Sequence, residues 1–336
     1  MLGRPITRVL CSASTSLRYD ALALAVLTPL SQAEASVVAR EYGLGELVRI
    51  EGIPAGSVNS NFRLIASNGT YFLRIYEEQG RDGAVEEGEL LLRLAAAGVA
   101  TPRPLTRADG GVIGTAAGKP IAVFPWREGV HRCQAGVTAR DARRVGEALA
   151  SVHRAGANEA RGEGRFRYED LLARLDVIAG ARDATLAAQA PILRAKLDTW
   201  TNARDASLPR GLIHGDLFRD NVLWDDAGAI AALLDFESAS GGVLAYDLMV
   251  TVLAWCFGDS LDRALASAMI DGYESVRPLT REERRGLVAE GCAAAIRFTI
   301  TRITDYAMRV SDQPRVVKEW RRFAARLAAL EAIERL

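Results

Sequence analysis

The spacing of hydrophobic and polar residues divides the chain into a first part of short alternating runs and a second part of helical repeats. Residues 31–46 begin with Ser31 three positions before Glu34, a capping-box pattern, and predict a helix. The apolar runs that follow are short, and Asn68-Gly69 between two of them is a strong hairpin signal. This pattern predicts three strands, at about 47–52, 60–66 and 70–76.

The pattern changes after Gly129. Before it, residues 85–99 have helical spacing, and residues 101–129 predict two more strands joined by a glycine-rich turn around Asp109-Gly110-Gly111. After it, residues 211–236 predict two short strands with Gly228 at the turn between them. The remaining segments predict helices, at 138–156, 168–180, 185–204, 244–257, 260–274, 280–307 and 314–334.

These elements predict an α+β fold with two lobes. The first lobe, residues 25–128, holds a five-stranded antiparallel sheet and an inserted helix, and the second, residues 129–336, is mostly helical around a small β unit. Residues 1–24 are predicted to be a disordered extension. The apolar run that follows Asp20 is short and has no strongly basic stretch before it, unlike a secretory signal.

The composition excludes several classes of partner. Lysine and arginine together number 42, as do aspartate and glutamate, so the net charge of zero gives no electrostatic reason to expect a nucleic acid or a membrane. No stretch reaches the roughly 18 uninterrupted apolar residues that span a bilayer. The four cysteines form no C-x-x-C pair and the three histidines have no zinc spacing, which indicates free thiols in a cytoplasmic protein.

A group of polar residues interrupts the apolar runs of residues 211–236. His214 and Asp216 are followed by Asn221, and Asp235 comes after the next apolar run. Protein kinases carry H-R-D and N at the same spacing, followed by D-F-G. Phosphoryl transfer needs a carboxylate that orients the attacking hydroxyl, and it needs oxygen ligands for Mg²⁺. A loop between two paired strands can hold Asp216 and Asn221 in one cleft, next to Asp235.

The alternative is a polar turn in which Asp216 and Asn221 bond to the nearby backbone. That alternative accounts for either residue alone. It does not account for three ligand-type residues at kinase spacing between apolar strands, so the pattern favours a phosphotransfer site.

At these residues the chain resembles the aminoglycoside phosphotransferase and choline kinase superfamily, which has a protein-kinase-like fold. The similarity lies in HGDLFRDNVLW and LLDFESASGGVLAYDLMV, and it extends over about residues 31–330. Four further blocks are similar to the homoserine kinase branch of this superfamily: EYGLGELVRIEGIPAGSVNSNFRL, AAAGVATPRPL, YDLMVTVLAWCF and RFTITRITDY.

The resemblance implies a role for each residue of the polar group. Asp216 would be the catalytic base, and Asn221 and Asp235 would bind Mg²⁺. His214 would orient the loop. Asp247, in AYDLM, would steady the loop as a buried carboxylate, and a helix N-terminal cap is the alternative for it.

The nucleotide side departs from the kinase pattern. A kinase strand normally carries a phosphate-binding lysine, and the equivalent position here is Arg74, which the strand alternation directs into the cleft. Arginine can bind phosphate through two nitrogens. Glu87 is the expected partner of Arg74, with Glu86 and Glu89 as competitors. An exposed strand arginine is the alternative.

Other residues near the predicted lobe boundary and in the loop before the second strand are candidates for ATP. The loop offers Ser57 and Asn59 to phosphate groups. The segment VFPWREG brings Phe124 and Trp126 to the place where a hinge would bind adenine. A tryptophan packed in the core is the alternative for Trp126.

The acceptor implied by the resemblance is L-homoserine, whose carboxylate requires a cation. Arg297 and Arg302 lie in the block RFTITRITDY, and residues five positions apart cannot both face one point of a regular helix. An exposed or salt-bridged arginine is the alternative for each. Asp305 is the candidate for the ammonium group, and Asn61 is a further acceptor candidate.

The sequence therefore predicts a kinase that uses ATP and Mg²⁺ to phosphorylate homoserine for threonine biosynthesis. A kinase of the same fold acting on choline, ethanolamine, methylthioribose or an aminoglycoside is the first alternative. A nucleotide-binding module without activity is the second, although Asp216, Asn221 and Asp235 are all present. A protein-substrate kinase is disfavoured because no A-P-E segment follows Asp235. The sequence leaves open whether the protein is a monomer or a homodimer.

Overall fold

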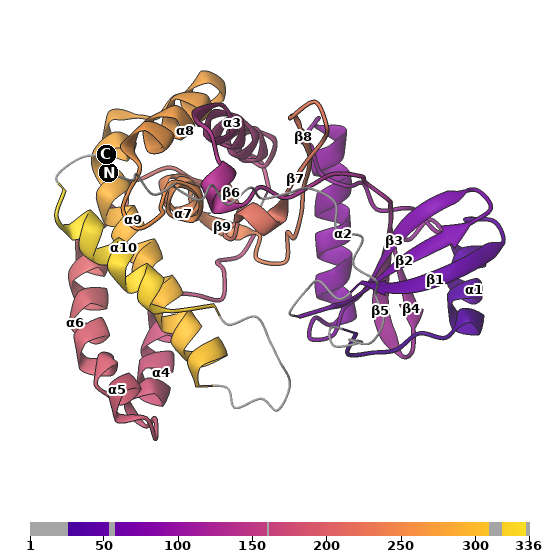
Figure 1. Cartoon of the computed structure of the whole chain (residues 1–336), viewed down its shortest axis with the longest axis horizontal. Helices are drawn as coiled ribbons and strands as arrows, with labels where there is room; N and C mark the ends of the chain where they lie inside the picture. The colour runs from indigo at the N-terminus through magenta and orange to yellow at the C-terminus, as the bar shows by residue number, and fades with distance from the viewer. Residues whose placement is uncertain (1–25, 54–57, 160, 309–317, 334–336) are drawn as a thin grey trace, which may run out of the picture.

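The computed structural model describes residues 26–53, 58–159, 161–308 and 318–333. The extension predicted at 1–24 and the candidate Ser57 lie outside these residues. The chain forms two lobes that follow one another along the long axis of the molecule, with the strand-rich lobe at one end and the helical lobe at the other (Figure 1). No helix in the described ranges is both long enough and apolar enough to cross a membrane.

The first lobe is built on a five-stranded antiparallel sheet in the order β1-β2-β3-β5-β4. The strands are β1 (Leu47–Ile53), β2 (Ser60–Ala66), β3 (Gly69–Ile75), β4 (Ile113–Ala116) and β5 (Lys119–Pro125). Two helices accompany them, α1 (Gln32–Glu41) and α2 (Arg81–Ala96). Helix α1 begins with the predicted capping box, in which Ser31 and Glu34 each accept a backbone N–H of the other.

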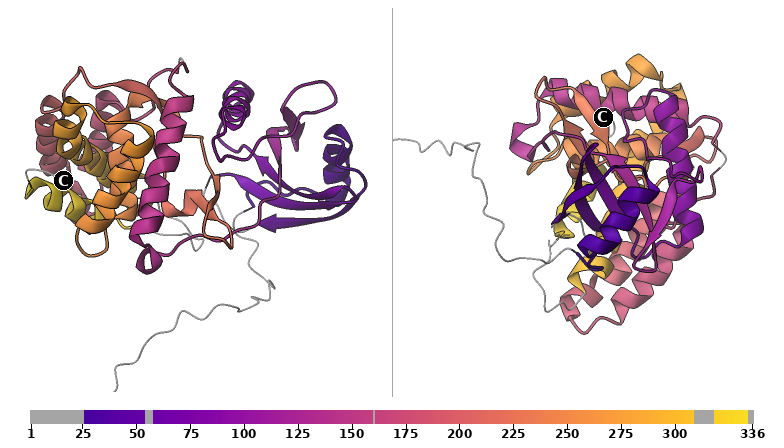
Figure 2. Two further views of the ribbon diagram at one scale, coloured as in Figure 1. Left: turned by 90° about the horizontal axis from the view of Figure 1, so that it is seen from above. Right: turned by 90° about the vertical axis from the view of Figure 1, so that its right-hand side faces the viewer.

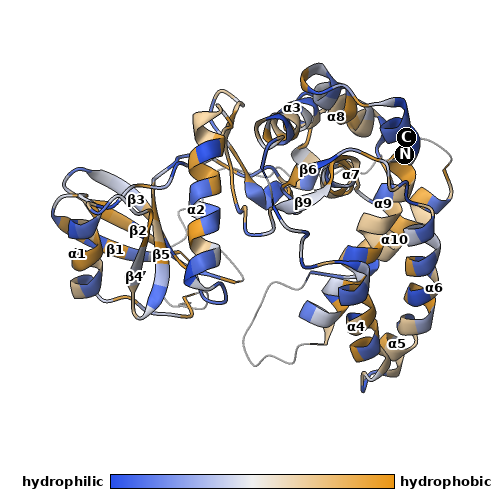
Figure 3. Ribbon diagram, turned by 180° about the vertical axis from the view of Figure 1, so that it is seen from behind, coloured by the Kyte–Doolittle hydropathy of each residue, from blue (hydrophilic) through white to orange (hydrophobic). Residues whose placement is uncertain are grey.

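The two faces of this sheet have different partners. Alternation along the strands directs Leu64 and Val123 toward α1, where they join the apolar core of the first lobe. The opposite face carries Asn61 and Arg74 directly across from each other. Helix α2 lies on this second face, toward the helical lobe (Figure 2), and shows alternating hydrophilic and hydrophobic bands along its length (Figure 3).

The second lobe is mostly helical. Its helices are α3 (Ala139–Ala155), α4 (Tyr168–Ala179), α5 (Ala184–Ala187), α6 (Gln189–Asn202), α7 (Leu244–Trp255), α8 (Arg263–Val276), α9 (Arg281–Arg302) and α10 (Arg321–Glu331), and a π-helical turn at Ile303–Ala307 follows α9. Helix α7 is strongly apolar and almost wholly buried, with α3, α8 and α9 packed around it.

Two small antiparallel sheets hold the polar segment of the second lobe. They pair β6 with β9 and β7 with β8. Their bounds are β6 (Arg210–Ile213), β7 (Val222–Trp224), β8 (Ile230–Leu233) and β9 (Ser240–Val243). The strand-turn-strand predicted within 211–236, with Gly228 at its turn, is confirmed by β7 and β8, and Gly228 has a φ of 71°. The two strands that flank the loop with Asp216 were expected to pair with each other, and this is wrong because the loop joins two separate sheets. Strand β9 was missed because Gly241-Gly242 break the apolar alternation.

A second correction concerns the strands of the first lobe. The glycine-rich turn at Asp109-Gly110-Gly111 does not join two strands, because both β4 and β5 follow it. The Asp109 carboxylate accepts Gly111 N at 3.0 Å and closes this turn on itself. The hairpin turn lies at Ala117 and Gly118, which both have positive φ. The two-lobe α+β fold with five antiparallel strands is confirmed.

Candidate active site

Three residues of the predicted polar group, His214, Asp216 and Asn221, lie in a tight loop, residues 214–221, called the HGD loop below. Backbone hydrogen bonds from Phe218 N to Asp216 O (2.7 Å) and from Asn221 N to Phe218 O (3.0 Å) fold it into consecutive turns. The Asn221 side chain donates from Nδ2 to Asp216 O at 2.8 Å. No described residue donates to Asn221 Oδ1, so this oxygen is left to act as a ligand.

His214 joins the HGD loop to the end of β8. Its Nε2 donates to Leu234 O at 3.0 Å, and its Nδ1 accepts from Asp216 N at 3.4 Å. Because a carbonyl only accepts and an amide N–H only donates, these contacts require the neutral ring with its proton on Nε2. The ring also packs against Phe236, with 4.6 Å between ring centroids.

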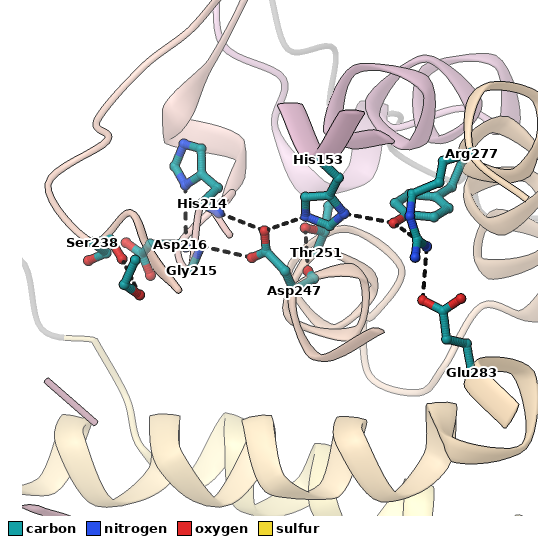
Figure 4. Close-up of polar contacts among 11 residues, drawn as sticks. His153, His214, Gly215, Asp216, Ser238, Asp247, Thr251, Arg277 and Glu283 are labelled. Atoms are coloured by element: carbon teal, nitrogen blue, oxygen red, sulfur yellow. Dashed lines mark hydrogen bonds and ion pairs between the residues drawn. The ribbon is translucent and has the colours of Figure 1, made fainter. Parts of the chain in front are cut away.

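Asp247 is buried beneath the HGD loop and not at a helix cap, since the N-cap of α7 is Val243. Its Oδ2 accepts from His214 N at 2.7 Å, and its Oδ1 accepts from Gly215 N at 2.8 Å (Figure 4). His153 Nε2 lies 3.0 Å from Asp247 Oδ2. Burial is the largest single influence on the pKa of Asp247 and raises it, but His153, His214 and the backbone N–H of Gly215 act together in the opposite direction, so the pKa lies below its usual value.

Asp235 follows β8 in a backbone conformation that few residues adopt. Its φ is 63°, in the left-handed region where aspartate and asparagine are tolerated better than most other side chains. Leu234 N donates to Asn221 O at 2.8 Å, so Asp235 comes directly after a contact with the HGD loop. Burial raises the pKa of Asp216, Arg297 acts in the opposite direction, and Asp235 adds to the rise.

Arg74 lies between the two lobes, where it meets a carboxylate from each of them. Its Nη1 lies 3.1 Å from Glu237 Oε1 and 3.6 Å from Glu87 Oε1. Glu87 is the partner expected from the sequence, whereas the Glu89 carboxylate lies near Arg93 and the main-chain carbonyl of Glu86 accepts from Arg161. Glu237 was missed, although it stands next to the aspartate and phenylalanine after β8. One guanidinium cannot balance two carboxylates fully, and burial raises the pKa of Glu87 to about 8.

Two asparagines of the first lobe lie close to Arg74. Asn59 donates through Nδ2 to Glu237, the same glutamate that Arg74 contacts, and its Oδ1 accepts Glu77 N at 3.2 Å. Asn61 lies across from Arg74 in the register of β2 and β3 and is buried. Both are therefore on the cleft side of the sheet.

The two aromatic candidates differ in their surroundings. Phe124 is buried on the cleft face of β5 and packs against Phe72, with ring centroids 6.1 Å apart. Trp126 is half-buried, and the Arg63 guanidinium lies 4.8 Å from its ring centroid. Trp126 is thus not a residue of the apolar core, which was the alternative for it.

Arg297 is the arginine of α9 that reaches the HGD loop. Its Nη1 lies 3.9 Å from Asp216 Oδ1, and its guanidinium is stacked between Phe166 and Phe298, 3.9 Å and 3.8 Å from their ring centroids. The residue is 6% exposed, and its Nε and Nη1 have no hydrogen-bond partner among the described residues. The alternative of an exposed arginine is wrong here. A buried cation with unused donors is suited to bind the anionic group of a small molecule.

The other acceptor candidates on this side of the second lobe point elsewhere. Arg302 donates to Glu319 O at 3.2 Å. Asp305 Oδ1 forms an ion pair with Arg174 Nη1 at 2.6 Å, so the charge of Asp305 is balanced within the protein. Neither side chain contacts Asp216.

A cleft of about 900 Å³ opens beside the HGD loop. It is lined among others by Gly215, Glu237, Tyr246, Phe166 and Arg297. Within the described part of the chain, no three histidine, cysteine or acidic side chains come together in a metal-binding group. A metal ion in this site would therefore take some of its ligands from other groups, such as a carboxamide or a bound phosphate.

Residues 49–279 match the phosphotransferase enzyme family. The chain belongs to this family. This phosphotransferase is 36% identical over 296 residues to a homoserine kinase of Sinorhizobium fredii, covering 85% of this chain and 88% of that protein. It is 35% identical over 294 residues to a homoserine kinase of Methylocella silvestris, covering 84% and 88%. The resemblance found in the sequence is confirmed.

Solved structures share the fold of this phosphotransferase at low identity. A choline kinase from Streptococcus pneumoniae superposes with a TM-score of 0.63 at 15% identity, over 90% of this chain and 100% of that one. An amicoumacin kinase superposes with a TM-score of 0.67 at 14% identity, over 89% and 91%. The predicted protein-kinase-like fold is thereby confirmed, and the phosphotransferase is a small-molecule kinase.

Proposed function

We propose that this phosphotransferase transfers the γ-phosphoryl group of ATP to the hydroxyl of L-homoserine. The observation that carries the proposal is the pair formed by Asp216 and Arg297, a carboxylate and a buried cation whose atoms approach to 3.9 Å beside the cleft. Homoserine offers a hydroxyl to the first and a carboxylate to the second. The names of the relatives at 35% and 36% identity support the same acceptor. The product, O-phosphohomoserine, would serve threonine biosynthesis.

Asp216 would orient the acceptor hydroxyl and accept its proton. Its Oδ1 is directed toward Arg297, and its main-chain carbonyl is held by Asn221. The pKa of Asp216 is raised by burial, which makes the carboxylate a stronger base than one in water. The contacts of His214 and Asp247 with the loop backbone fix where this carboxylate stands.

Asn221 and Asp235 would hold Mg²⁺. The unused carboxamide oxygen of Asn221 and the carboxylate of Asp235 are ligands of the kind that Mg²⁺ prefers. When bound, the ion supplies positive charge that offsets the charge of the ATP phosphates. Two protein ligands fit this metal, because Mg²⁺ keeps several waters and takes phosphate oxygens.

Arg74 would bind ATP phosphates in place of the usual lysine. Its Nη1 contacts Glu237 at 3.1 Å, and its Nε has no partner among the described residues. This Nε would be available to a phosphate oxygen, while the more deeply buried Glu87 orients the guanidinium. An amicoumacin kinase of the same fold has been solved with AMP-PNP and Ca²⁺, which supports nucleotide binding by this phosphotransferase.

An ATP-consumption screen tests the proposed acceptor. Purified protein is incubated with Mg²⁺, ATP and, separately, homoserine, serine, choline, ethanolamine, methylthioribose or an aminoglycoside. We expect homoserine to give the highest kcat/KM, because it alone presents both a carboxylate and a hydroxyl at the end of a two-carbon side chain. A higher kcat/KM for an acceptor without a carboxylate would refute the role of Arg297.

Replacing Arg297 by methionine should raise the KM for homoserine by about 10- to 100-fold, the effect of losing a hydrogen-bonded charge partner. The KM for ATP should stay within about twofold. Loss of the cation also raises the pKa of Asp216 further, since Arg297 lowers it. The acid limb of kcat/KM should therefore move to higher pH, because a larger fraction of Asp216 is protonated at a given pH.

Two comparisons isolate the carboxylate contact. Arg326→Met removes another buried arginine stacked on an aromatic ring, with its guanidinium 4.3 Å from Phe323, and should leave the KM for homoserine unchanged. Aminopropanol is homoserine without its carboxylate, and Arg297→Met should use it about as well as the unaltered enzyme does. If Arg297→Met penalises both acceptors equally, the arginine does not bind the carboxylate.

A further inference from the structure

Four helices contribute to a chain of polar side chains that ends on the HGD loop (Figure 4). It runs from Glu283 through Arg277 and Tyr273 to His153 and Asp247. All of these residues except Arg277 are at most 2% exposed. Polar groups buried so deeply destabilise a fold unless they are paired, so their complete pairing has a structural purpose.

A close crossing of α3 and α8 brings the chain together. Gly146 on α3 and Gly272 on α8 leave no room for a side chain, because a β-carbon would lie 2.0 Å from Met269 O and 2.1 Å from Arg143 O, respectively. Tyr273 follows Gly272 and meets the His153 ring edge to face, with 5.5 Å between centroids. The contact between the two rings therefore depends on packing specific to this pair of helices.

The direction of each hydrogen bond in the chain follows from Arg277, which can only donate. Its Nη1 contacts Glu283 Oε1 at 2.8 Å and Tyr273 Oη at 3.1 Å. Tyr273 Oη thus accepts from the arginine, and its own proton points to His153 Nδ1, at 2.7 Å. The ring proton of His153 must then be on Nε2, which donates to Asp247 Oδ2 at 3.0 Å.

The other possible arrangement, a doubly protonated His153, leaves one proton without an acceptor. Both His153 Nδ1 and Arg277 would then donate to Tyr273 Oη, and no other described residue accepts the tyrosine proton. The groups that face His153 are the Asp247 carboxylate from α7, Tyr273 and Arg277 from α8 and its end, and His214 above Asp247. Because Arg277 donates to Tyr273 Oη and the tyrosine proton needs His153 Nδ1 as its acceptor, the hydrogen bonds favour the neutral ring of His153.

We propose that Tyr273 and Arg277 are positioning residues, which hold His153 as the neutral Nε2–H tautomer and thereby fix Asp247 under the HGD loop. Asp247 Oδ2 accepts hydrogen bonds from His153 Nε2 and His214 N, and its Oδ1 accepts one from Gly215 N. The backbone that presents Asp216 therefore depends on a hydrogen bond made two helices away. The effect of Tyr273 and Arg277 on kcat rests on the proposed function, in which Asp216 is the base. The tautomer of His153 does not depend on that function.

The tautomer is tested by NMR of the full chain labelled with ¹⁵N-histidine. The chain has three histidines, so His131→Gln and a comparison with His153→Gln assign the signals. We expect His153 at neutral pH to show an unprotonated Nδ1 that accepts a hydrogen bond and a protonated Nε2. A protonated Nδ1 at neutral pH would overturn the proposal, whatever the acceptor of the enzyme.

The kinetic test uses Tyr273→Phe. We expect kcat to fall about tenfold, the equivalent of one hydrogen bond of ordinary strength, with both KM values within about twofold. The Nδ1 signal of His153 should move to that of a nitrogen without a hydrogen-bond donor. The matched control is Tyr42→Phe, which removes another buried, hydrogen-bonded hydroxyl, from the first lobe, and should change neither the His153 signal nor kcat.

Arg277→Lys supplies the rescue experiment. Lysine keeps the charge and the donors, so it should preserve the His153 spectrum and keep kcat within about threefold of the unaltered enzyme. Thermal unfolding of each variant shows whether it is folded under the assay conditions. If Tyr273→Phe leaves both the Nδ1 signal and kcat unchanged, or if Tyr42→Phe lowers kcat equally, Tyr273 does not position the loop.

Discussion

Asp216→Asn should lower kcat by a factor on the order of a thousand, within the range of general base catalysis. The substitution keeps the size of the side chain and the main-chain contacts of the loop, so ATP affinity should stay within about twofold. Homoserine affinity should not fall either, because removing a negative charge beside Arg297 does not weaken the binding of a carboxylate. The loss therefore belongs to the chemical step, measured as kcat with both substrates saturating.

Asp220→Asn is the matched control for Asp216→Asn. Asp220 lies in the same loop but is exposed, so its substitution should leave kcat nearly unchanged. The pH dependence gives an independent check. The rate of the unaltered enzyme should fall in acid as Asp216 takes up a proton at its raised pKa, and the residual rate of Asp216→Asn should lack this limb. A variant that keeps more than about a tenth of the normal kcat would show that Asp216 is not the base.

Asp235→Asn should weaken Mg²⁺-dependent ATP binding on the order of a hundredfold, because it removes the only proposed metal ligand that carries a charge. Loss of one partner from a buried charged pair costs about 3 kcal/mol or more, which corresponds to that factor. Titration calorimetry with ATP, once with Mg²⁺ and once with EDTA, measures the effect. The unaltered enzyme should bind ATP much more tightly with Mg²⁺, and the variant should bind it about equally in both conditions.

The backbone of Asp235 decides which substitution is informative. Its φ is 63°, and asparagine tolerates this conformation well, whereas alanine would add strain of about 1–2 kcal/mol. Asp235→Asn therefore separates metal binding from folding better than Asp235→Ala. Asp226→Asn, in the exposed turn of the same β unit, should leave Mg²⁺-dependent binding intact. If Asp235→Asn keeps the Mg²⁺ dependence, another group binds the metal.

The sequence by itself determined the parts of this protein that depend on neighbouring residues. Short segments were enough to predict the capping box of Ser31 and Glu34 and the spacing of the HGD loop. They also gave the strand alternation that places Arg74 on the face of its sheet toward the second lobe. Periodicity, caps and loop spacing are local properties, so one segment contains the whole signal. The family followed from the same segments.

Only the tertiary structure decided which distant residues meet. Arg297 and Arg302 are both arginines of α9, so their side chains have the same chemistry. Arg297 packs between Phe166 and Phe298 and lies near Asp216, and this packing is a tertiary contact that the helix sequence does not record. The contact of Arg74 with Glu237 spans 163 positions and that of His153 with Tyr273 spans 120, so no local pattern records either of them. Such pairs form because two lobes or two helices approach closely, and that approach results from the packing of the whole chain.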